Sequence, residues 1–468
     1  MAVAILRPAI PAQTRHAFTS QGREGIDTLP KGIGGILGIT LGLVASCTTC
    51  AFADPIQLNN NVCNLVLDTK PKTEPQVPKP GYLHSYVDPV FGTKVTRITG
   101  DPGTAIPNVG STWGKVSRPG YEDRAAWNAD QTILLLENTA AGPLLLDGNN
   151  YKPLAAENLG PFYSSEARWH PALPSKMLYL GNNARGTACE FGLWDIYTSS
   201  ITVQQTISGY TGCNLGGTGN WSSDATMVAV EATRSSDKKL VAFALNLATG
   251  KKYADIDLLA SGFLAGTIDW VSISRSGDLI YVNGGLANGT NRSDNAAIFD
   301  LSGNVIQKWL EYGSPSHSDL SVDSNGNEVV VGVDKSSTYL GKIIMRNMRT
   351  GIRTPLDTGG FPSLVSARNN TLANFAFVND TGSKSPNYWP PYFDEIFAVT
   401  LDGSKRTPRL AHAHSNWVNY DSQGFVVPSP DGLRFVFASD WKQPSGLPVQ
   451  TYVADMRGLC SPGSLKEK

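Results

Sequence analysis

One pattern repeats from about residue 120 onward, and this repeat constrains the fold more than any other feature of the chain. Each unit has a polar turn, a β-rich run, a loop, and further β-rich runs that often end in Asp or Gly. Successive turns are roughly 44 to 62 residues apart, a period typical of propeller blades. The turns begin at Asn128, Ala172, Ser222, Arg275, Asp323, Arg368 and Pro430.

An apolar β-rich run follows each turn, as at residues 133–136, and Gly-containing hairpins such as residues 245–250 recur farther along the repeats. Several runs are apolar on both faces, which fits strands that are packed between neighbouring sheets. An isolated strand expected at residues 94–99 is well placed to pair with the last repeat, at residues 451–455. The sequence therefore predicts an all-β fold: a seven-bladed β-propeller at residues 85–460, closed by an N-terminal strand that pairs with the last blade.

The N-terminus carries the features of an export signal. Lys31 precedes an apolar run at residues 32–46, and an Ala-x-Ala cleavage site ends at Ala53. The run is too short to span a bilayer comfortably. We therefore expect residues 1–53 to be a signal peptide, and the mature protein to be secreted or periplasmic without a transmembrane segment. The alternative is a lipobox in which Cys47 is lipidated and anchors the protein to a membrane.

The rest of the chain outside the repeats has no expected globular fold. Residues 54–84 contain several Lys-Pro and Pro-Lys steps and are expected to form an extended lead-in, and residues 461–468 a loose tail. With 39 basic and 40 acidic residues, the chain lacks the excess positive charge that nucleic-acid binders use. We expect a monomer that binds no nucleic acid.

Four cysteines remain after the signal, an even number in an oxidising compartment, which suggests two disulfides with three alternative pairings. A pair of Cys63 with Cys460 would tie the two ends of the mature chain together. A pair of Cys189 with Cys213 would join neighbouring segments.

Propellers place function around the central channel, where loops enter the first strand of each blade. Titratable side chains at this position of the repeats are therefore the candidates for a site. They are Arg124, Arg168, His170, Asp269, His317, Asp319, Arg368, His412, His414 and Tyr420.

Four segments carry a resemblance to a known family: residues 88–99, 316–320, 365–369 and 427–432. They resemble bacterial propellers related to the oligogalacturonate lyases. The turns of the Pro-Asp-Gly type also resemble TolB-like propellers, which bind protein partners and catalyse nothing. The resemblance covers most of residues 85–456, and its motifs are mainly structural.

The lyase resemblance implies β-elimination on a uronate-containing polysaccharide or oligosaccharide. This reaction needs a cation or donor on the carboxylate, a base near the C5 proton and an acid at the leaving oxygen. We assign His317 or Tyr420 to the base and the acid, and Arg368 or Arg168 to the carboxylate, which a guanidinium binds in a bidentate manner. His414 completes the predicted catalytic set, and Asp269 is predicted to bind substrate.

A divalent metal is not favoured as a cofactor, and no metal ligands are assigned. Metal-using relatives supply a histidine cluster where this chain has Leu364 and Gln423. His412 and His414 could substitute, because alternate residues of a strand share one face. The sequence leaves the cofactor unknown.

Aromatic residues give a second hypothesis about function. Tyr388, Trp389 and Tyr392 lie in an inserted loop at residues 387–393, where they would stack on sugar rings or border a protein interface. This loop is consistent with a non-catalytic propeller that binds a protein or a glycan in the cell envelope. Tryptophans just before four of the turns are either a sugar platform or, as their period favours, packing between blades: Trp127, Trp169, Trp221 and Trp270. Enzyme and binding protein both stay open, with a slight preference for the lyase.

Overall fold

The computed structural model describes residues 54–157, 168–356, 362–372, 374–380 and 390–464. The predicted signal peptide, the predicted binding residues Tyr388 and Trp389, and the last four residues of the predicted tail lie outside the described residues. Within the described part, the 3-10 helices are η2 (Thr290–Arg292), η3 (Tyr420–Ser422) and η4 (Arg457–Leu459). In that part of the chain no helix is both long and apolar enough to cross a membrane.

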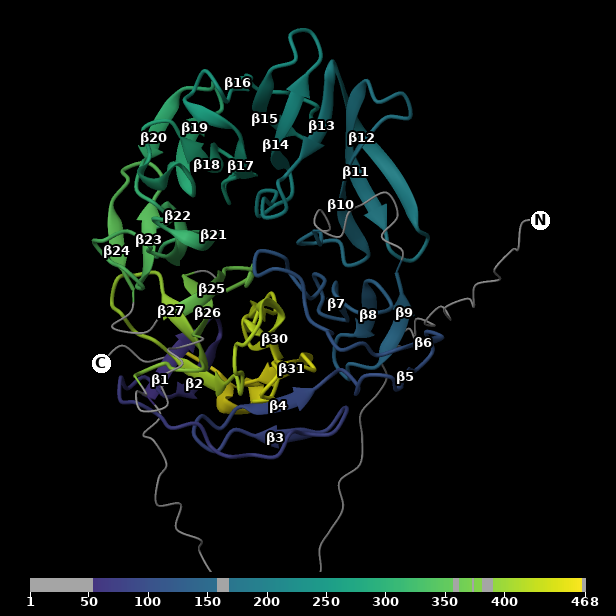
Figure 1. Cartoon of the computed structure of the whole chain (residues 1–468), viewed down its shortest axis with the longest axis vertical. Helices are drawn as coiled ribbons and strands as arrows, with labels where there is room; N and C mark the ends of the chain where they lie inside the picture. Colours follow the sequence, from purple (N-terminus) through teal and green to yellow (C-terminus); the bar gives the residue numbers. More distant parts are fainter. Residues whose placement is uncertain (1–53, 158–167, 357–361, 373, 381–389, 465–468) are drawn as a thin grey trace, which may run out of the picture. The chain divides into compact units, whose positions relative to one another are not determined.

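Antiparallel sheets follow one another along the chain, and Figure 1 shows them in sequence order. The first two have three strands each: β7 (Ile133–Leu136), β8 (Leu144–Asp147) and β9 (Pro153–Ala156), then β10 (Lys176–Asn182), β11 (Ala188–Asp195) and β12 (Ser200–Ser208). Single bridges from Trp127 to Leu134 and from Trp169 to Met177 add a further segment beside β7 and β10.

The next sheets have four strands each. The third contains β13 (Tyr210–Asn214), β14 (Met227–Arg234), β15 (Leu240–Asn246) and β16 (Ile256–Asp257), and the fourth contains β17 (Phe263–Ile273), β18 (Leu279–Leu286), β19 (Asn295–Asp300) and β20 (Val305–Trp309). The fifth contains β21 (Ser316–Val322), β22 (Glu328–Val333), β23 (Ile343–Asn347) and β24 (Arg353–Pro355), and the sixth contains β25 (Pro362–Ser366), β26 (Phe375–Asp380), β27 (Glu395–Thr400) and β28 (Arg409–His412).

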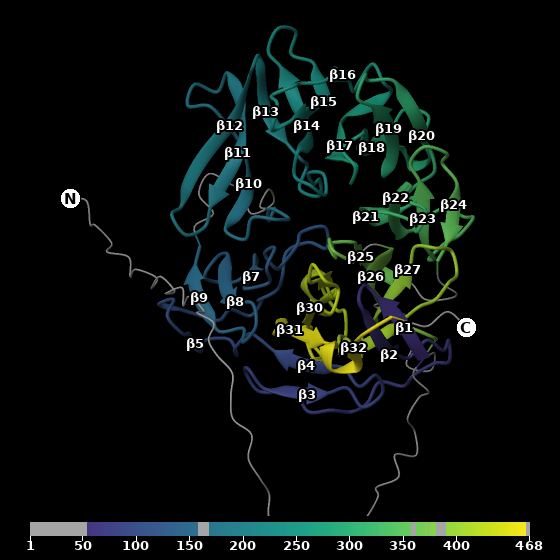
Figure 2. The same cartoon turned by 180° about the vertical axis from the view of Figure 1, so that it is seen from behind.

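The last sheet of the series is built from both ends of the described chain. Its strands, in order, are β29 (Val427–Pro428), β30 (Arg434–Ser439), β31 (Gln450–Asp455), β4 (Lys94–Arg97) and β3 (Ser85–Val87). Strand β4 pairs antiparallel with β31, with Arg97 opposite Tyr452. Figure 2 shows β4 beside β31 from behind. A short separate hairpin consists of β5 (Ala105–Ile106) and β6 (Ser111–Thr112).

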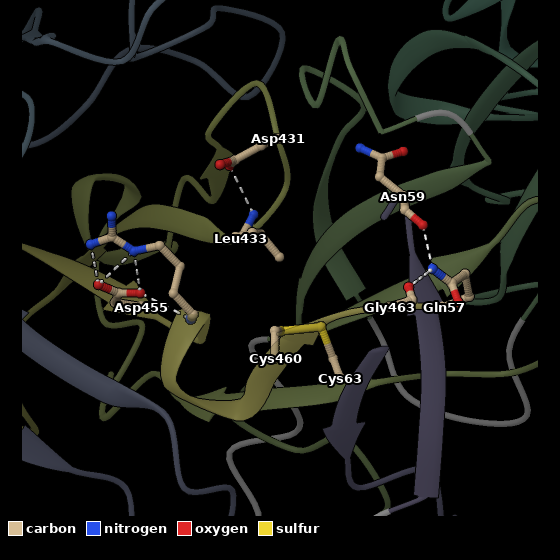
Figure 3. The surroundings of a disulfide bond; sticks show 9 residues. Gln57, Asn59, Cys63, Asp431, Leu433, Asp455, Cys460 and Gly463 are labelled. Atoms are coloured by element: carbon tan, nitrogen blue, oxygen red, sulfur yellow. Dashed lines mark hydrogen bonds and ion pairs between the residues drawn. A yellow bond between two sulfur atoms is a disulfide. The ribbon is translucent and has the colours of Figure 1, made fainter. Parts of the chain in front are cut away.

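The two ends of the described chain also meet in a smaller sheet. It consists of β1 (Asp54–Leu58), β2 (Asn61–Leu65) and β32 (Cys460–Pro462). Cys63 lies opposite Cys460, and a disulfide joins them (Figure 3). Strands β1 and β2 fall in the segment expected to be an extended lead-in, and β32 reaches into the expected tail. They differ from the expectation because β1 and β2 form a hairpin, and β2 pairs with β32 from the other end of the chain.

A second disulfide joins Cys189 of β11 to Cys213 of β13, which belong to neighbouring sheets. The cysteine count allowed three alternative sets of pairs. The structure has the set considered above, Cys63 with Cys460 and Cys189 with Cys213.

Apolar side chains fill the space between each pair of consecutive sheets. Leu135 of β7 clusters with Tyr179 of β10, and Tyr281 of β18 clusters with Val330 of β22. The last sheet packs in the same way against the first, because Val436 of β30 shares a cluster with Trp127 and Leu134. Each aliphatic or aromatic side chain buried in this way contributes about 1.5–3 kcal/mol.

The four tryptophans of the repeat belong to this packing. Trp127, Trp169, Trp221 and Trp270 are all buried. Their repeated position therefore reflects packing within and between the sheets, and no sugar platform is formed by them.

Candidate functional site

The connection between β6 and β7 contacts several distant sheets through residues 122–124. The hydroxyl of Ser366, at the end of β25, donates to the carbonyl oxygen of Glu122 over 2.5 Å. The side-chain amide of Asn220, which precedes β14, donates to the carbonyl oxygen of Asp123 over 2.9 Å. Residues 122–124, which we term the central segment, thus link the third and sixth sheets to the first.

Arginines at the repeat position form ion pairs around this central segment. Arg168 donates from Nη2 to Oδ2 of Asp123 at 2.9 Å, and both side chains are 1% exposed. Arg368 binds Asp319 with two bonds, from Nε to Oδ2 at 2.7 Å and from Nη2 to Oδ1 at 2.5 Å. These pairs join the first strands of different sheets, so each guanidinium is engaged by a carboxylate of the protein.

Arg124 forms a third pair, with Glu137, and both its Nε and its Nη2 donate to the carbonyl oxygen of Gly217. Arg168 donates to the same carbonyl from Nη2, at 2.8 Å. Two guanidinium groups therefore converge on one backbone oxygen, which fixes the loop after β13 against the central segment.

The acidic side chains of the central segment are fully buried. Burial outweighs the attraction of Arg168 and raises the pKa of the Asp123 carboxyl to about 6. Burial, together with repulsion from Asp123, raises the pKa of Glu122 well above its usual range. Neither carboxylate oxygen of Glu122 has a hydrogen-bond partner among the described residues. Such a carboxyl is stable chiefly in its protonated form.

Tyr420, a predicted catalytic residue, lies on an aromatic platform formed with Arg118, Tyr121 and Phe425. Its ring is 5.3 Å from that of Phe425, and the guanidinium carbon of Arg118 is 4.1 Å from the centre of the Phe425 ring and 5.5 Å from that of Tyr420. Arg118 also pairs with Asp421 at 2.8 Å. Tyr420 is 54% exposed, so this platform, which we call the Tyr420 platform, presents an aromatic face to solvent.

Asp269, predicted to bind substrate, is an exposed residue of β17 that acts on this platform electrostatically. Burial, the charge of Glu122 and, more weakly, that of Asp269 raise the pKa of the Tyr121 hydroxyl. Partial desolvation and repulsion from Asp294 raise the pKa of Asp269 itself.

His317 is the second residue of β21 and is half-buried. Its φ of +45° lies in the left-handed region, which costs energy for a residue with a side chain. It precedes Asp319, the partner of Arg368, by two residues on the same strand. Arg368 itself follows the end of β25, and Asp319 also accepts the backbone N–H of Ala367 at 2.9 Å.

His414, the fourth predicted catalytic residue, lies elsewhere, in a buried charged cluster. Its Nδ1 pairs with Glu74, and its ring stacks on Trp441 with centroids 4.4 Å apart. Lys442 pairs with both Glu74 and Asp394. Glu74 belongs to residues 66–80, the lead-in strap, which runs over the sixth and last sheets. His414 therefore binds the strap to the fold.

The strap residues engage His412 as well. His412 Nδ1 is 3.0 Å from Oδ2 of Asp88, and burial opposes but does not overcome the effect of Asp88, which raises the pKa of His412. Its Nε2 is 3.5 Å from the carbonyl oxygen of Lys72. The two histidines thus face different carboxylates, since β28 ends at His412 and His414 has a φ of +50°.

Tyr392 is fully buried, although it was predicted to bind substrate. Its ring lies 4.9 Å from that of Phe397, and the guanidinium carbon of Arg409 is 5.3 Å from its centre. The ring belongs to the apolar cluster between the fifth and sixth sheets. A sugar could not stack on this residue without opening the sheet.

Sequence reasoning located the arginines of the centre and Asp319, the partner of Arg368, but missed the partners of Arg124 and Arg168. Glu122, Asp123 and Glu137 were not singled out, nor was Glu74 in the strap. One signal was present: three arginines at equivalent positions, Arg124, Arg168 and Arg368, need counter-charges when they are buried.

The comparisons with known proteins concern the fold. No family model and no curated protein matches the chain. The solved oligogalacturonate lyase of Vibrio parahaemolyticus is 13% identical, with a TM-score of 0.51, and the match covers 86% of this chain and 98% of the lyase chain. An oligogalacturonate lyase in complex with manganese is 15% identical, with the same TM-score and coverage. TolB from Acinetobacter baumannii is 13% identical over 67% of this chain and 75% of its own, with a TM-score of 0.32.

The likeness to the two lyases shows that the chain has an all-β, propeller-like fold that resembles theirs. The manganese of the second lyase has no evident counterpart, because no group of three or more His, Cys, Asp or Glu side chains among the described residues could hold a metal ion. The residues described therefore do not fit such an ion, and we derive no step through it.

Proposed function

We propose that the chain is an exported, seven-bladed β-propeller that acts on a uronate-containing glycan by β-elimination. The cyclic packing of the sheets, in which the last clusters with the first, supports the blade number, and the β4–β31 pairing supports closure by an N-terminal strand. Two disulfides support an oxidising compartment, secreted or periplasmic, with lipidation of Cys47 as the lesser alternative.

The Tyr420 platform is the observation that carries this proposal. An exposed aromatic ring beside a guanidinium offers a stacking surface and a polar neighbour at the same place. In the proposed reaction a base removes the C5 proton, the electron pair forms the C4–C5 double bond, and the C4–oxygen bond breaks as an acid protonates the leaving oxygen. His317 and Tyr420 carry these two proton transfers.

The buried pairs revise the other roles proposed from the sequence. Arg368 and Arg168 are engaged by Asp319 and Asp123, so they position the first strands and the central segment around the site. His414 also has a positioning role, because it anchors the lead-in strap through Glu74. Asp269 borders the substrate at the platform, and the aromatic loop with Tyr388 and Trp389 remains a proposed sugar contact.

A second candidate function is a non-catalytic propeller that binds a glycan or a protein. The observation that favours it is the engagement of Arg368 and His414 in buried ion pairs, which leaves fewer groups for chemistry. Both candidates use the same platform, and they differ only in whether product is formed.

An elimination assay separates the two. Mature protein beginning at Asp54 is incubated with pectic, alginate, ulvan-like and glucuronan-type polymers, and ultraviolet absorbance reports the C4–C5 double bond. We expect Tyr420→Phe and His317→Ala each to lower the rate by about 10²–10⁴-fold. Tyr197→Phe is the matched control, because Tyr197 is 57% exposed on another sheet.

The outcomes are distinct. Full activity in both variants overturns the assigned roles, and absence of product from folded wild-type protein on every polymer overturns the lyase proposal. In the second case, loss of polymer binding in Tyr420→Ala would support the binding propeller. A parallel reaction with a chelator tests the need for a divalent metal.

A further inference from the structure

A cavity of about 280 Å³ opens at the opposite end of the first strands from His317. It is lined by residues of the third to sixth sheets that lie in, or next to, the turn after the first strand of each sheet: Ser223, Arg275, Ser276, Ser321, Glu328 and Asn370. His317 begins β21, whereas Ser321 lies near its end, and four residues of a strand span about 13 Å. The cavity is therefore separate from the proposed proton-transfer residues. Its volume lies near the lower end of the range for small-ligand sites, about 300–1,000 Å³.

Arg275 lines both this cavity and a narrower one beside it. Both cavities are lined by Ser223, Arg275 and Asn370, and the narrower one is also lined by Trp169 and Trp221. Polar side chains and aromatic edges thus surround one guanidinium. This combination is typical of sites that bind small polar molecules.

Arg275 differs from the other arginines of the centre because no described carboxylate forms an ion pair with it. Arg168, Arg368 and Arg124 pair with Asp123, Asp319 and Glu137. Within the described residues, the side-chain hydrogen bonds of Arg275 instead run from Nη1, to the carbonyl oxygen of Ala367 at 3.2 Å and to Oδ1 of Asn370 at 3.1 Å.

The other edge of this guanidinium is not satisfied by the protein. Its Nε is buried and has no hydrogen-bond partner among the described residues. Nε and Nη2 together form the edge that binds a carboxylate in two parallel bonds. Asp319 and Glu328 act on this guanidinium electrostatically without pairing with it. A buried donor left without a partner is costly, so the site favours a ligand that accepts hydrogen bonds, such as an anion.

Asn370 supplies a second donor. Because its Oδ1 accepts from Arg275, its Nδ2 is the atom left to donate. Glu328, the nearby carboxylate, is held by the backbone N–H groups of Ser276 at 2.6 Å and Arg275 at 3.0 Å. Glu328 also lines the cavity, and these two backbone bonds engage both of its carboxylate oxygens.

We propose that this cavity binds a small organic carboxylate, held by the Nε–Nη2 edge of Arg275 and by the amide of Asn370. The site is additional to the Tyr420 platform and does not depend on the proposed elimination. Uronic acid monosaccharides and aliphatic carboxylates both present this group, so the test includes one of each.

The test is isothermal titration of the full mature chain with sodium galacturonate and, separately, with succinate. Galactose is the neutral probe, because it keeps the sugar ring without the carboxylate, and sulfate is the inorganic anion. We expect the carboxylates to bind and galactose not to bind. Arg275→Gln should weaken carboxylate binding at least tenfold, and Asn370→Ala should weaken it less.

Arg349→Gln is the matched control, since Arg349 is an exposed arginine that pairs with Asp278. It should bind as wild type does. Tyr420→Phe should bind succinate as wild type does, which separates this site from the platform. Binding only of galacturonate identifies a sugar-acid site, whereas equal binding of succinate identifies a general carboxylate site.

Three results would overturn the proposal: no binding of either carboxylate to folded wild-type protein, unchanged binding in both Arg275→Gln and Asn370→Ala, or tighter binding of sulfate than of both carboxylates. If Arg275→Gln does not fold, Arg275→Lys replaces it. That variant keeps the charge and loses the two-bonded edge, and it should weaken binding by the same order.

Discussion

At the scale of single residues, Arg368 and Asp319 test the difference between a positioning role and a substrate-binding role. Their ion pair is buried, so removing one partner leaves an unpaired buried charge. We expect Arg368→Ala to lower the free energy of unfolding by about 3–5 kcal/mol, measured by urea denaturation. Arg349→Ala, which breaks an exposed pair with Asp278, should cost about 1 kcal/mol or less. Unchanged stability of Arg368→Ala combined with lost glycan binding would instead assign Arg368 to substrate.

The same residues show how far the sequence could be read at this scale. The repeat identified Arg124, Arg168 and Arg368 as equivalent positions, and the structure places Arg124 in the central segment and the other two near it. Their partners could not be read from the repeat, because Asp123 and Glu137 have no equivalents in the other units. Which carboxylate pairs with which arginine depends on how the central segment crosses between the sheets. No local sequence pattern encodes that crossing.

At the scale of elements, the lead-in strap is held by a charge cluster whose stability depends on pH. Burial opposes the ionisation of Glu74, but the bond from His414 and the charge of Lys442 outweigh it and lower the pKa of Glu74 from 4.5 to about 2. A carboxyl whose pKa is lowered by folding stabilises the fold at pH values above its pKa in the unfolded chain. This contribution is lost as the pH falls toward 2. The size of the contribution at neutral pH is on the order of 3 kcal/mol.

We therefore expect Glu74→Gln to be less stable than wild type at pH 7, and the difference to shrink steadily between pH 4.5 and about 2. Denaturant unfolding of both proteins across this pH range measures it. Glu190→Gln, a change on the half-buried strand residue of β11, controls for loss of a carboxylate in general. A difference that stays constant with pH would show that the ionisation of Glu74 does not hold the strap.

Elements were predicted best where turn chemistry and apolar runs coincide. Residues 133–136 were expected as a strand and form β7, and the expected strand at 94–99 contains β4. The turn before β26 is held by Asn369, whose side-chain amide donates to the carbonyl oxygens of Leu372 and Phe375. The proline-rich lead-in was expected to be extended throughout residues 54–84. The β1–β2 hairpin within it was not anticipated, since β32, the strand that pairs with β2, is almost 400 residues away.

At the scale of the whole molecule, the two disulfides should differ in their contribution to stability. Cys63 and Cys460 are separated by 397 residues, whereas Cys189 and Cys213 are separated by 24. In the chain-entropy description a longer closed loop restricts the unfolded chain more, which gives about 3 kcal/mol for the short loop and about 5 or more for the long one. Replacing Cys63 and Cys460 together by serine should therefore lower the thermal midpoint more than replacing Cys189 and Cys213. The reverse order would show that the short bond is worth more through the packing of β11 on β13 than through chain entropy.

The Cys63–Cys460 bond also determines how the molecule responds to mechanical force. The bonded cysteines lie on the adjacent strands β2 and β32, at the two boundaries of the described chain. Tension applied to residues outside this bond passes from Cys63 to Cys460 through sulfur, so the sheets between them carry no load. After reduction, the same tension acts on the strands themselves. It passes through β32 to the β31–β4 pairing, which would be the first pairing of the propeller sheets to separate. A protein held at both ends in the cell envelope would extend by only a few residues while oxidised, and would unravel sheet by sheet once its thiols were free.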